Sequence, residues 1–171
     1  MKKQKGFSLI ELLIVVAIIL IIAAIAIPNL LRAKISANEA SAVGSMRSIV
    51  TAEISYNTAG WTSGTNPIGF SAALADLGPG TSTGACNPPT ATTTCYLDFV
   101  LASASVATAS KSGYYFTYAP VASGTLNTGF SVNGSPATPG QTGNRYFFTD
   151  QSGVIRFNPS TGATASDNPL Q

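Results

Sequence analysis

Residues 5–28, KGFSLIELLIVVAIILIIAAIAIP, are apolar over almost their whole length and carry one acidic residue, Glu11. The 21 residues from 7 to 27 would span roughly 30 Å as an α-helix, about the hydrocarbon thickness of a bilayer. A carboxylate in hydrocarbon costs several kcal/mol and is rare unless it has a partner or a task. The stretch therefore predicts a membrane-spanning helix in which Glu11 has a function.

The distribution of basic residues predicts how this helix is oriented. Three lysines precede the apolar run, and the next basic residue after it is Arg32. By the positive-inside rule, the first residues are expected in the cytoplasm and everything after Pro28 on the other side of the membrane.

Two simpler interpretations of the apolar run stay open. One is a secretory signal peptide, because Ala24-Ile25-Ala26 resembles a small-residue cleavage site. The length of the run and the presence of Glu11 argue against it. The other is a plain membrane anchor in which Glu11 reaches the interface.

The overall composition limits the classes of partner. Only 9% of the 171 residues are charged, against roughly 25% in an ordinary soluble protein. The net charge is +2, and removing the first six residues leaves six basic against seven acidic residues, or −1. Because no basic patch interleaved with aromatics is present, nucleic acid is not an expected partner.

The cysteines and the missing histidine limit the chemistry. Cys86 and Cys95 cannot supply the four ligands that zinc prefers, so a disulfide is the better interpretation, and it requires an oxidising compartment. Without histidine, the Ser-His-Asp and Cys-His arrangements are not available. We therefore expect no enzymatic activity, no cofactor and no metal.

Gly6-Phe7-Ser8-Leu9-Ile10-Glu11, with basic residues before it and an apolar helix after it, resembles the class III signal sequence of type IV pilins and the related pseudopilins. The resemblance covers the N-terminal 30 residues, and Pro28 falls where that family commonly has a proline. It implies that a prepilin peptidase cuts between Gly6 and Phe7 and methylates the new amino terminus of Phe7. The apolar helix then stays in the product.

This resemblance also gives Glu11 a role. Cleavage leaves a positive amine on Phe7, about one helical turn from Glu11. When helices pack side by side with an axial offset, Glu11 of one subunit would meet the Phe7 amine of its neighbour. An unpaired buried charge is strongly destabilising, so the pair would fix the register of assembly.

The rest of the chain is expected to continue the helix and then form a head. Pro28 predicts a kink or a short unwound stretch. An amphipathic helix follows, with one apolar face and one face of small residues; the apolar residues are Ile35, Val43, Met46, Val50 and Ile54, and the small ones Ala33, Ala37, Ala40, Ala42 and Gly44. The expected segments are a leader at 1–6, a membrane or filament-core helix at 7–28, an amphipathic helix at 29–59, a variable loop with Cys86–Cys95 at 60–113, and a sheet with a tail at 114–171.

Four segments of the head are predicted to be strands: 113–119, 129–133, 145–149 and 154–157. Asp150-Gln-Ser-Gly153 is a suitable hairpin turn between the last two. A short helical candidate lies at 71–77 in the loop, and the final Ser- and Thr-rich tail is expected to be loosely ordered. The fold class is α+β, a long N-terminal helix packed on a small antiparallel sheet.

Acidic residues of the head are too dispersed for an EF-hand loop. Type II secretion pseudopilins can hold calcium in loops beside the sheet, and Asp150 is the first residue to consider for such a role. A turn aspartate is the simpler interpretation of that residue.

Three functions fit these features. The first is a type IV pilus-like filament subunit, made in the bacterial inner membrane and exported to the cell surface by polymerisation, with further copies, prepilin peptidase and the pilus assembly machinery as partners. The second is a type II secretion pseudopilin in a periplasmic pseudopilus. The third is a monomeric, membrane-anchored binding module. Glu11 favours a polymer, because a lone anchor has no reason to keep a carboxylate in its span.

Overall fold

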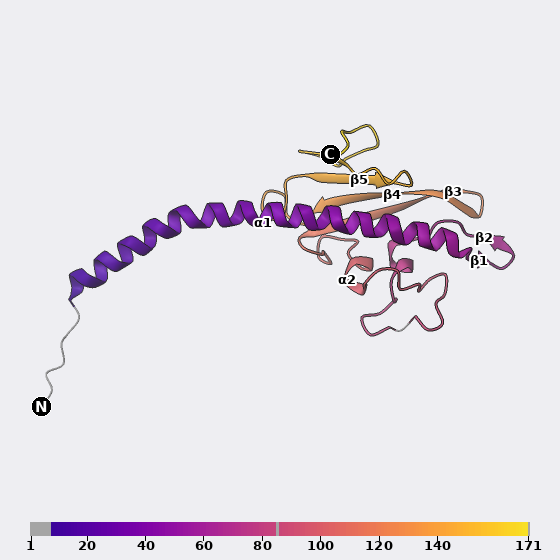
Figure 1. The fold of residues 1–171 in the computed structure, drawn as a ribbon, viewed down its shortest axis with the longest axis horizontal. Coiled ribbons are helices and arrows are strands. Elements are labelled where there is room, and N and C mark those ends of the chain that lie inside the picture. The colour runs from indigo at the N-terminus through magenta and orange to yellow at the C-terminus, as the bar shows by residue number, and fades with distance from the viewer. Residues whose placement is uncertain (1–7, 85, 171) are drawn as a thin grey trace, which may run out of the picture. The chain divides into compact units, whose positions relative to one another are not determined.

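The structure is a computed structural model that describes residues 8–84 and 86–170. The chain begins with one long helix, continues through a loop region with short elements, and ends in a four-stranded sheet (Figure 1). The elements are α1 (Leu9–Ala59), β1 (Thr62–Ser63), β2 (Asn66–Pro67), the 3-10 helix η1 (Leu74–Leu77), α2 (Phe99–Ala102), β3 (Tyr114–Ser123), β4 (Leu126–Pro136), β5 (Tyr146–Asp150) and β6 (Arg156–Asn158). The predicted α+β fold class is confirmed.

Two compact units make up the chain, Met1–Lys34 and Ile35–Gln171. From Leu9 on, the first unit belongs to α1, which is long and apolar enough at its N-terminal end to cross a membrane. Its large apolar side chains between residues 9 and 31 are all exposed. The helix continues through Pro28. A short unwound stretch, one of the two alternatives expected at this proline, is therefore not present there. The other alternative, a kink, stays a prediction.

In the second unit the strands follow the order β3-β4-β5-β6, and every neighbouring pair is antiparallel. All four predicted strands are therefore present. The turn at 150–153 also forms, with the Gly153 amide donating to the Asp150 carbonyl at 2.9 Å. Gly153 has a φ of 72°, which favours glycine, and the Asp150 carboxylate accepts from the Ser152 amide at 2.9 Å. Asp150 is thus a turn aspartate.

The core lies between the sheet and the part of α1 in the second unit (Figure 1). Its largest fully buried apolar side chains are Met46, Ile49, Tyr56, Leu77, Leu101, Tyr114, Phe116, Phe130, Val132 and Phe147. The predicted helix faces were wrong at two positions: Ile54 is 56% exposed, and Ala42 is completely buried. The buried residues Ala42, Ile49 and Tyr56 lie on one side of α1, because helix residues seven positions apart fall on the same side. Ile54 does not belong to this series and lies on another side of the helix.

The C-terminal tail is folded back on the sheet, so the expectation of a loosely ordered tail was wrong. Along β6 the Phe157 amide donates to the Asn168 carbonyl at 3.1 Å, and the Leu170 amide donates to the Ile155 carbonyl at 2.7 Å. Ala163 is buried as well. The tail is ordered by backbone hydrogen bonds to β6 and the residue before it. Such bonds cannot be predicted from the Ser- and Thr-rich composition of the tail.

One buried hydroxyl in the sheet offers a test of the core. Thr149 is fully buried, and its Oγ1 has no hydrogen-bond partner among the residues that the structure describes. Thr149→Val keeps the shape and removes this cost, so it should raise the free energy of unfolding by about 1 kcal/mol. The fluorescence of Trp61, the only tryptophan of the chain, would follow urea unfolding of the full chain in detergent. Thr117→Val on the exposed side of β3 is the control, and a less stable Thr149→Val protein would contradict the assignment.

Candidate assembly site

The first turn of α1 holds the carboxylate predicted to matter most. The Ser8 amide donates to Glu11 Oε2 at 3.0 Å, which satisfies one of the free amides at the helix start. A negative charge is also favourable at this end of a helix, because the macrodipole is positive there. Glu11 is therefore oriented within its own chain, close to the N-terminal end of the helix.

Glu11 has no cationic partner in the described part of its own chain. Within residues 8–84 and 86–170 the ion pairs are Arg145–Glu39 and Lys111–Asp98, and neither includes Glu11. Around it, α1 presents exposed apolar side chains. The predicted cleavage and methylation positions, Gly6 and Phe7, lie outside the described residues, so the Phe7–Glu11 contact stays a prediction.

A second glutamate of α1 fastens the helix to the sheet. Glu39 Oε1 accepts from the backbone amides of Asn144 and Arg145 at 2.9 and 3.1 Å, and Glu39 Oε2 pairs with Arg145 Nε at 2.8 Å. The Arg145 guanidinium also lies 5.6 Å and 5.7 Å from the ring centres of Phe147 and Phe157. Burial alone raises the pKa of Glu39, but the hydrogen bonds from Asn144 and Arg145 outweigh it, so the pKa lies below its ordinary value.

A third glutamate, Glu53, is fully buried and binds the loop that follows β2. Its carboxyl contacts the amide and the hydroxyl of Ser71. Burial raises the pKa of Glu53 above its ordinary value, although the hydrogen bonds from Ser71 oppose the shift. Neither Glu39 nor Glu53 was predicted from the sequence, but both interrupt the apolar face of α1, and a charge on such a face is a usable signal.

Both edges of the sheet are protected against pairing with another strand. On the outer side of β3, the amides of Tyr114 and Phe116 donate to the carbonyls of Lys111 and Ala104. Pro120 follows on the same side by alternation and has no amide hydrogen to offer. The outer side of β6 is paired with the tail. Assembly through strand addition is therefore disfavoured.

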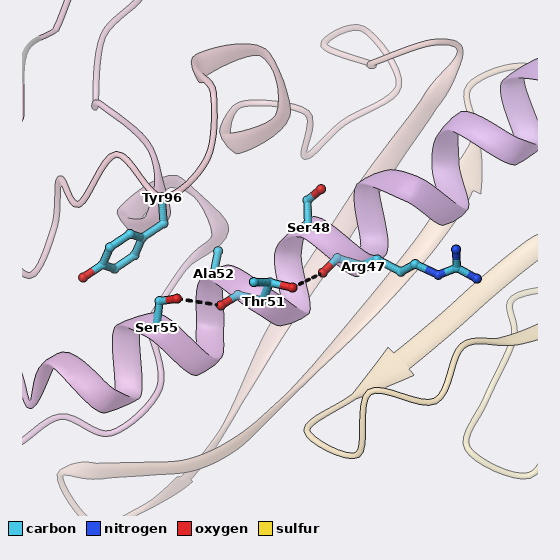
Figure 2. Close-up of a pocket in the computed structure, with 6 residues that line it drawn as sticks. All are labelled: Arg47, Ser48, Thr51, Ala52, Ser55 and Tyr96. Carbon is cyan, nitrogen blue, oxygen red and sulfur yellow. Dashed lines mark hydrogen bonds between the residues drawn. The ribbon is translucent and has the colours of Figure 1, made fainter.

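A hollow beside α1 has the lining of an ordinary polar surface. It measures about 380 Å³ and is lined by Arg47, Ser48, Thr51, Ala52, Ser55 and Tyr96 (Figure 2). The hydroxyls of Thr51 and Ser55 both donate to helix carbonyls at 3.0 Å. Arg47 is the one charged side chain in the lining, so the hollow contains no acid–base pair for catalysis.

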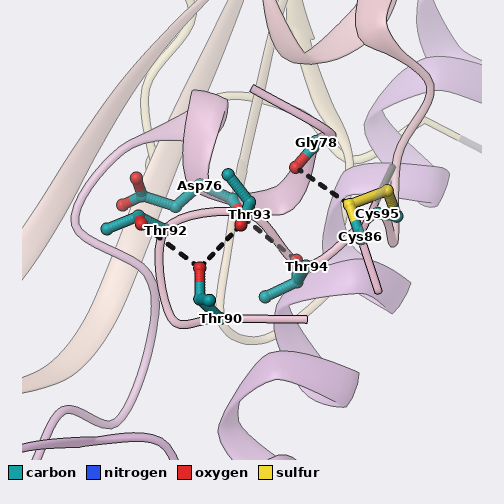
Figure 3. Close-up of a disulfide and its surroundings, with 8 residues drawn as sticks. All are labelled: Asp76, Gly78, Cys86, Thr90, Thr92, Thr93, Thr94 and Cys95. Atoms are coloured by element: carbon teal, nitrogen blue, oxygen red, sulfur yellow. Dashed lines mark hydrogen bonds between the residues drawn. A yellow bond between two sulfur atoms is a disulfide. The ribbon is translucent and has the colours of Figure 1, made fainter. Parts of the chain in front are cut away.

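The predicted disulfide Cys86–Cys95 is confirmed, with the two Cα atoms 5.8 Å apart (Figure 3). The bonded segment is anchored at its far end, where the Thr94 amide and hydroxyl donate to the Asp76 carbonyl at 3.1 and 3.0 Å. The Tyr56 hydroxyl reaches into it and donates to the Ala91 carbonyl at 2.8 Å. The disulfide and these hydrogen bonds together fasten the loop to α1 and η1.

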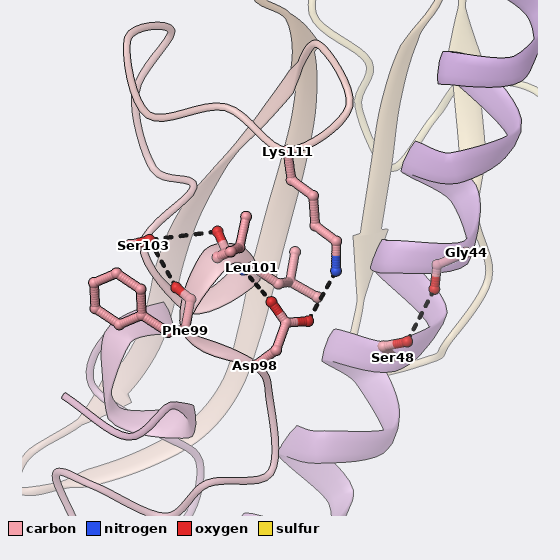
Figure 4. Close-up of polar contacts among 8 residues, drawn as sticks. Gly44, Ser48, Asp98, Phe99, Leu101, Ser103 and Lys111 are labelled. Carbon is pink, nitrogen blue, oxygen red and sulfur yellow. Dashed lines mark hydrogen bonds and ion pairs between the residues drawn. The ribbon is translucent and has the colours of Figure 1, made fainter. Parts of the chain in front are cut away.

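Asp98 and Lys111 form an ion pair that stabilises the end of the same loop (Figure 4). Asp98 accepts from Lys111 Nζ at 2.8 Å and caps α2 by accepting from the Leu101 amide at 2.8 Å. The bond from Lys111 lowers the pKa of Asp98. Among the described residues, no three His, Cys, Asp or Glu side chains are grouped closely enough to hold a metal.

The described chain thus has an apolar, exposed N-terminal helix with one acidic residue near its start, followed by an α+β head. Residues 1–27 match the family model described as the prokaryotic N-terminal methylation motif. The resemblance of the N-terminal segment to the type IV pilin family is confirmed by this motif and by two relatives.

The first relative is the "Type IV wide pilus major component PilA4" of Thermus thermophilus, 64% identical over 39 residues, which are 23% of this chain and 30% of that protein. The second is the "Type IV major pilin protein PilA" of Myxococcus xanthus, 44% identical over 54 residues, or 32% of this chain and 24% of that protein. The chain thus matches less than a third of the length of either relative. No solved structure gives a significant match.

Proposed function

We propose that this protein is a structural subunit of a type IV pilus-like filament that polymerises through its N-terminal helix. The observation that carries the proposal is Glu11, a carboxylate without a cationic partner among the described residues, set in an exposed apolar helix. Before assembly the bilayer would cover this surface, and after assembly neighbouring helices would do so. Prepilin peptidase would cut between Gly6 and Phe7 and methylate Phe7.

In the filament, Glu11 would pair with the methylated amine of Phe7 in the next subunit. A charge buried without a partner is strongly destabilising, so subunits in the wrong axial register would be rejected. The blocked edges of the sheet support this route, because they leave the helix rather than strand addition as the means of polymerisation.

The proposed location follows from the helix and the disulfide. Before assembly the protein would be a single-pass inner-membrane protein with its first residues in the cytoplasm, and the head would lie in an oxidising compartment where Cys86–Cys95 persists. The pilus assembly machinery would then extrude it. Its role would be structural rather than enzymatic.

A type II secretion pseudopilin has the same architecture. The names of both relatives describe pilus components, which favours a surface pilus for this chain. Immunogold imaging of the producing cell distinguishes the two: long surface fibres carrying the protein support the proposal, while a signal confined to the periplasm would overturn it.

Processing gives a direct test of the N-terminal assignment. Intact-mass measurement of the native protein should show loss of residues 1–6 and the addition of one methyl group. The control is the same protein from cells lacking prepilin peptidase, which should keep all its residues. A native chain that begins at Ile27 would instead identify a secretory signal peptide.

A further inference from the structure

Two basic residues follow the apolar part of α1 directly. Large apolar side chains of this helix are exposed as far as Leu31, and the exposed residues Arg32 and Lys34 come next. The stretch from Leu9 to Leu31 extends about 33 Å along a helix, which matches the roughly 30 Å of hydrocarbon in a bilayer. With this stretch in a membrane, the two basic residues lie at the level of the lipid headgroups on the far side.

No side chain of α1 neutralises either of these cations. Side chains three or four positions apart are neighbours on a helix surface, and none of those positions around Arg32 or Lys34 holds an acidic residue. Neither ion pair in the described part of the chain includes them. The next carboxylate along α1, Glu39, is already bound by Arg145. Both cations thus remain open to an anion from another molecule.

The proposed cleavage would leave these two residues as the only basic side chains close to the apolar stretch. The three earlier lysines all lie in residues 1–6, which are removed with the leader. The next basic residue beyond Lys34 is Arg47, which belongs to the second unit. The basic side chains of the mature helix would therefore flank its far end, where a negatively charged lipid surface attracts arginine and lysine.

The helix directs the two cations to different lipids. Residues two positions apart on a helix point about 200° apart, so Arg32 and Lys34 leave α1 on opposite sides. The planar guanidinium of Arg32 can bind two oxygens of one phosphate, whereas the ammonium of Lys34 binds as a point charge. Both side chains have apolar stems, which lie along the lipid tails while the charged ends reach the headgroups.

We propose that Arg32 and Lys34 each bind the headgroup of an anionic phospholipid and so fix the depth at which the unassembled subunit rests in the membrane. This rests on the membrane insertion that the proposed function includes, and it does not require polymerisation. The partner is a lipid rather than a carboxylate of a second subunit, because the length of the apolar stretch places both cations at headgroup level.

Native mass spectrometry of the full chain in detergent micelles counts the lipids that bind. Dioleoylphosphatidylglycerol is the anionic probe, and dioleoylphosphatidylcholine is the neutral reference. The wild type should bind two more molecules of the anionic lipid than Arg32→Gln/Lys34→Gln does, each about fivefold more tightly than the neutral lipid. Arg32→Gln and Lys34→Gln should each lose one of the two. Raising sodium chloride to about 0.5 M should weaken both, because salt screens exposed charges.

Arg47→Gln is the matched control, because it removes one positive charge from the second unit and should keep both lipids. Resistance to alkaline carbonate extraction checks that every variant stays inserted. All of them should resist extraction, since the apolar stretch is unchanged.

The outcomes separate this proposal from that of the filament. Equal binding of the anionic lipid by the wild type and the double variant would refute the lipid contacts and leave the filament intact. A double variant that keeps its lipids but forms no fibres would instead assign the two cations to a neighbouring subunit. Release of the wild type by carbonate would contradict both proposals, which share the inserted helix. Cells without fibres whose protein still binds the two lipids would contradict the filament alone.

Discussion

Glu11→Ala should remain membrane-inserted and correctly processed but assemble no filaments. The variant keeps the apolar surface of α1, so insertion is unaffected. It removes the one group that would neutralise the Phe7 amine of a neighbouring subunit, and that amine would then be buried without a partner at every contact along the fibre. Membrane fractionation, intact mass and electron microscopy of sheared surface fibres measure the three steps separately.

Leu12→Ala is the control for this experiment, because it shortens a side chain in the same turn and keeps the carboxylate. It should still form fibres. Glu11→Asp keeps the charge with a shorter reach and should assemble poorly rather than not at all. Normal fibres from Glu11→Ala would remove the proposed pair.

Glu39→Ala should lower the free energy of unfolding by about 2–3 kcal/mol, the largest effect we expect for a single substitution in the polar contacts of the head. It leaves the amides of Asn144 and Arg145 without their acceptor and the Arg145 guanidinium without its partner. Urea unfolding of the full chain in detergent, followed by Trp61 fluorescence, measures the loss. The half-exposed Arg145 side chain keeps the effect below that of a fully buried ion pair.

The stability that Glu39 contributes depends on pH in the opposite direction to that of Glu53, whose pKa is raised by burial. Because the folded pKa of Glu39 lies below its unfolded value, its stabilisation is complete above the unfolded pKa and is lost as the pH falls through the folded one. Glu39→Gln should lose this acid sensitivity.

Lys111→Gln, which breaks the more exposed pair with Asp98, is the control for Glu39→Ala and should lower the free energy of unfolding by at most about 1 kcal/mol. If Glu39→Ala lowers the free energy of unfolding no more than Lys111→Gln does, the Glu39 contacts do not hold the helix to the sheet.

The features predicted correctly from the sequence are those with a local signal. The strands have β-prone runs, the turn at 150–153 has its glycine, and two cysteines in a chain without histidine favour a disulfide. The features that were missed depend on tertiary contacts. The helix α2 and the β1–β2 pair are too short to show a periodic pattern, and the tail is ordered by backbone bonds to β6.

The glutamates of α1 show the same difference between local signals and tertiary contacts. Glu11 is conspicuous because no other residue between 7 and 27 is charged. Glu39 and Glu53 share α1 and the same type of side chain, yet one is bound by an arginine and two amides and the other by a serine. Those partners lie 18 and more than 100 residues along the chain, so the sequence alone does not show which groups bind each glutamate.

The Cys86–Cys95 bond also makes the protein convenient to label. The sequence has two cysteines and both are bonded, so a third one introduced by mutation is the sole reactive thiol. Thr125 is exposed at the tip of the β3–β4 hairpin, and it is remote in sequence from both α1 and the loop closed by the disulfide. Maleimide dyes attached at Thr125→Cys would report the assembly of the proposed filament, without reduction of the native bond.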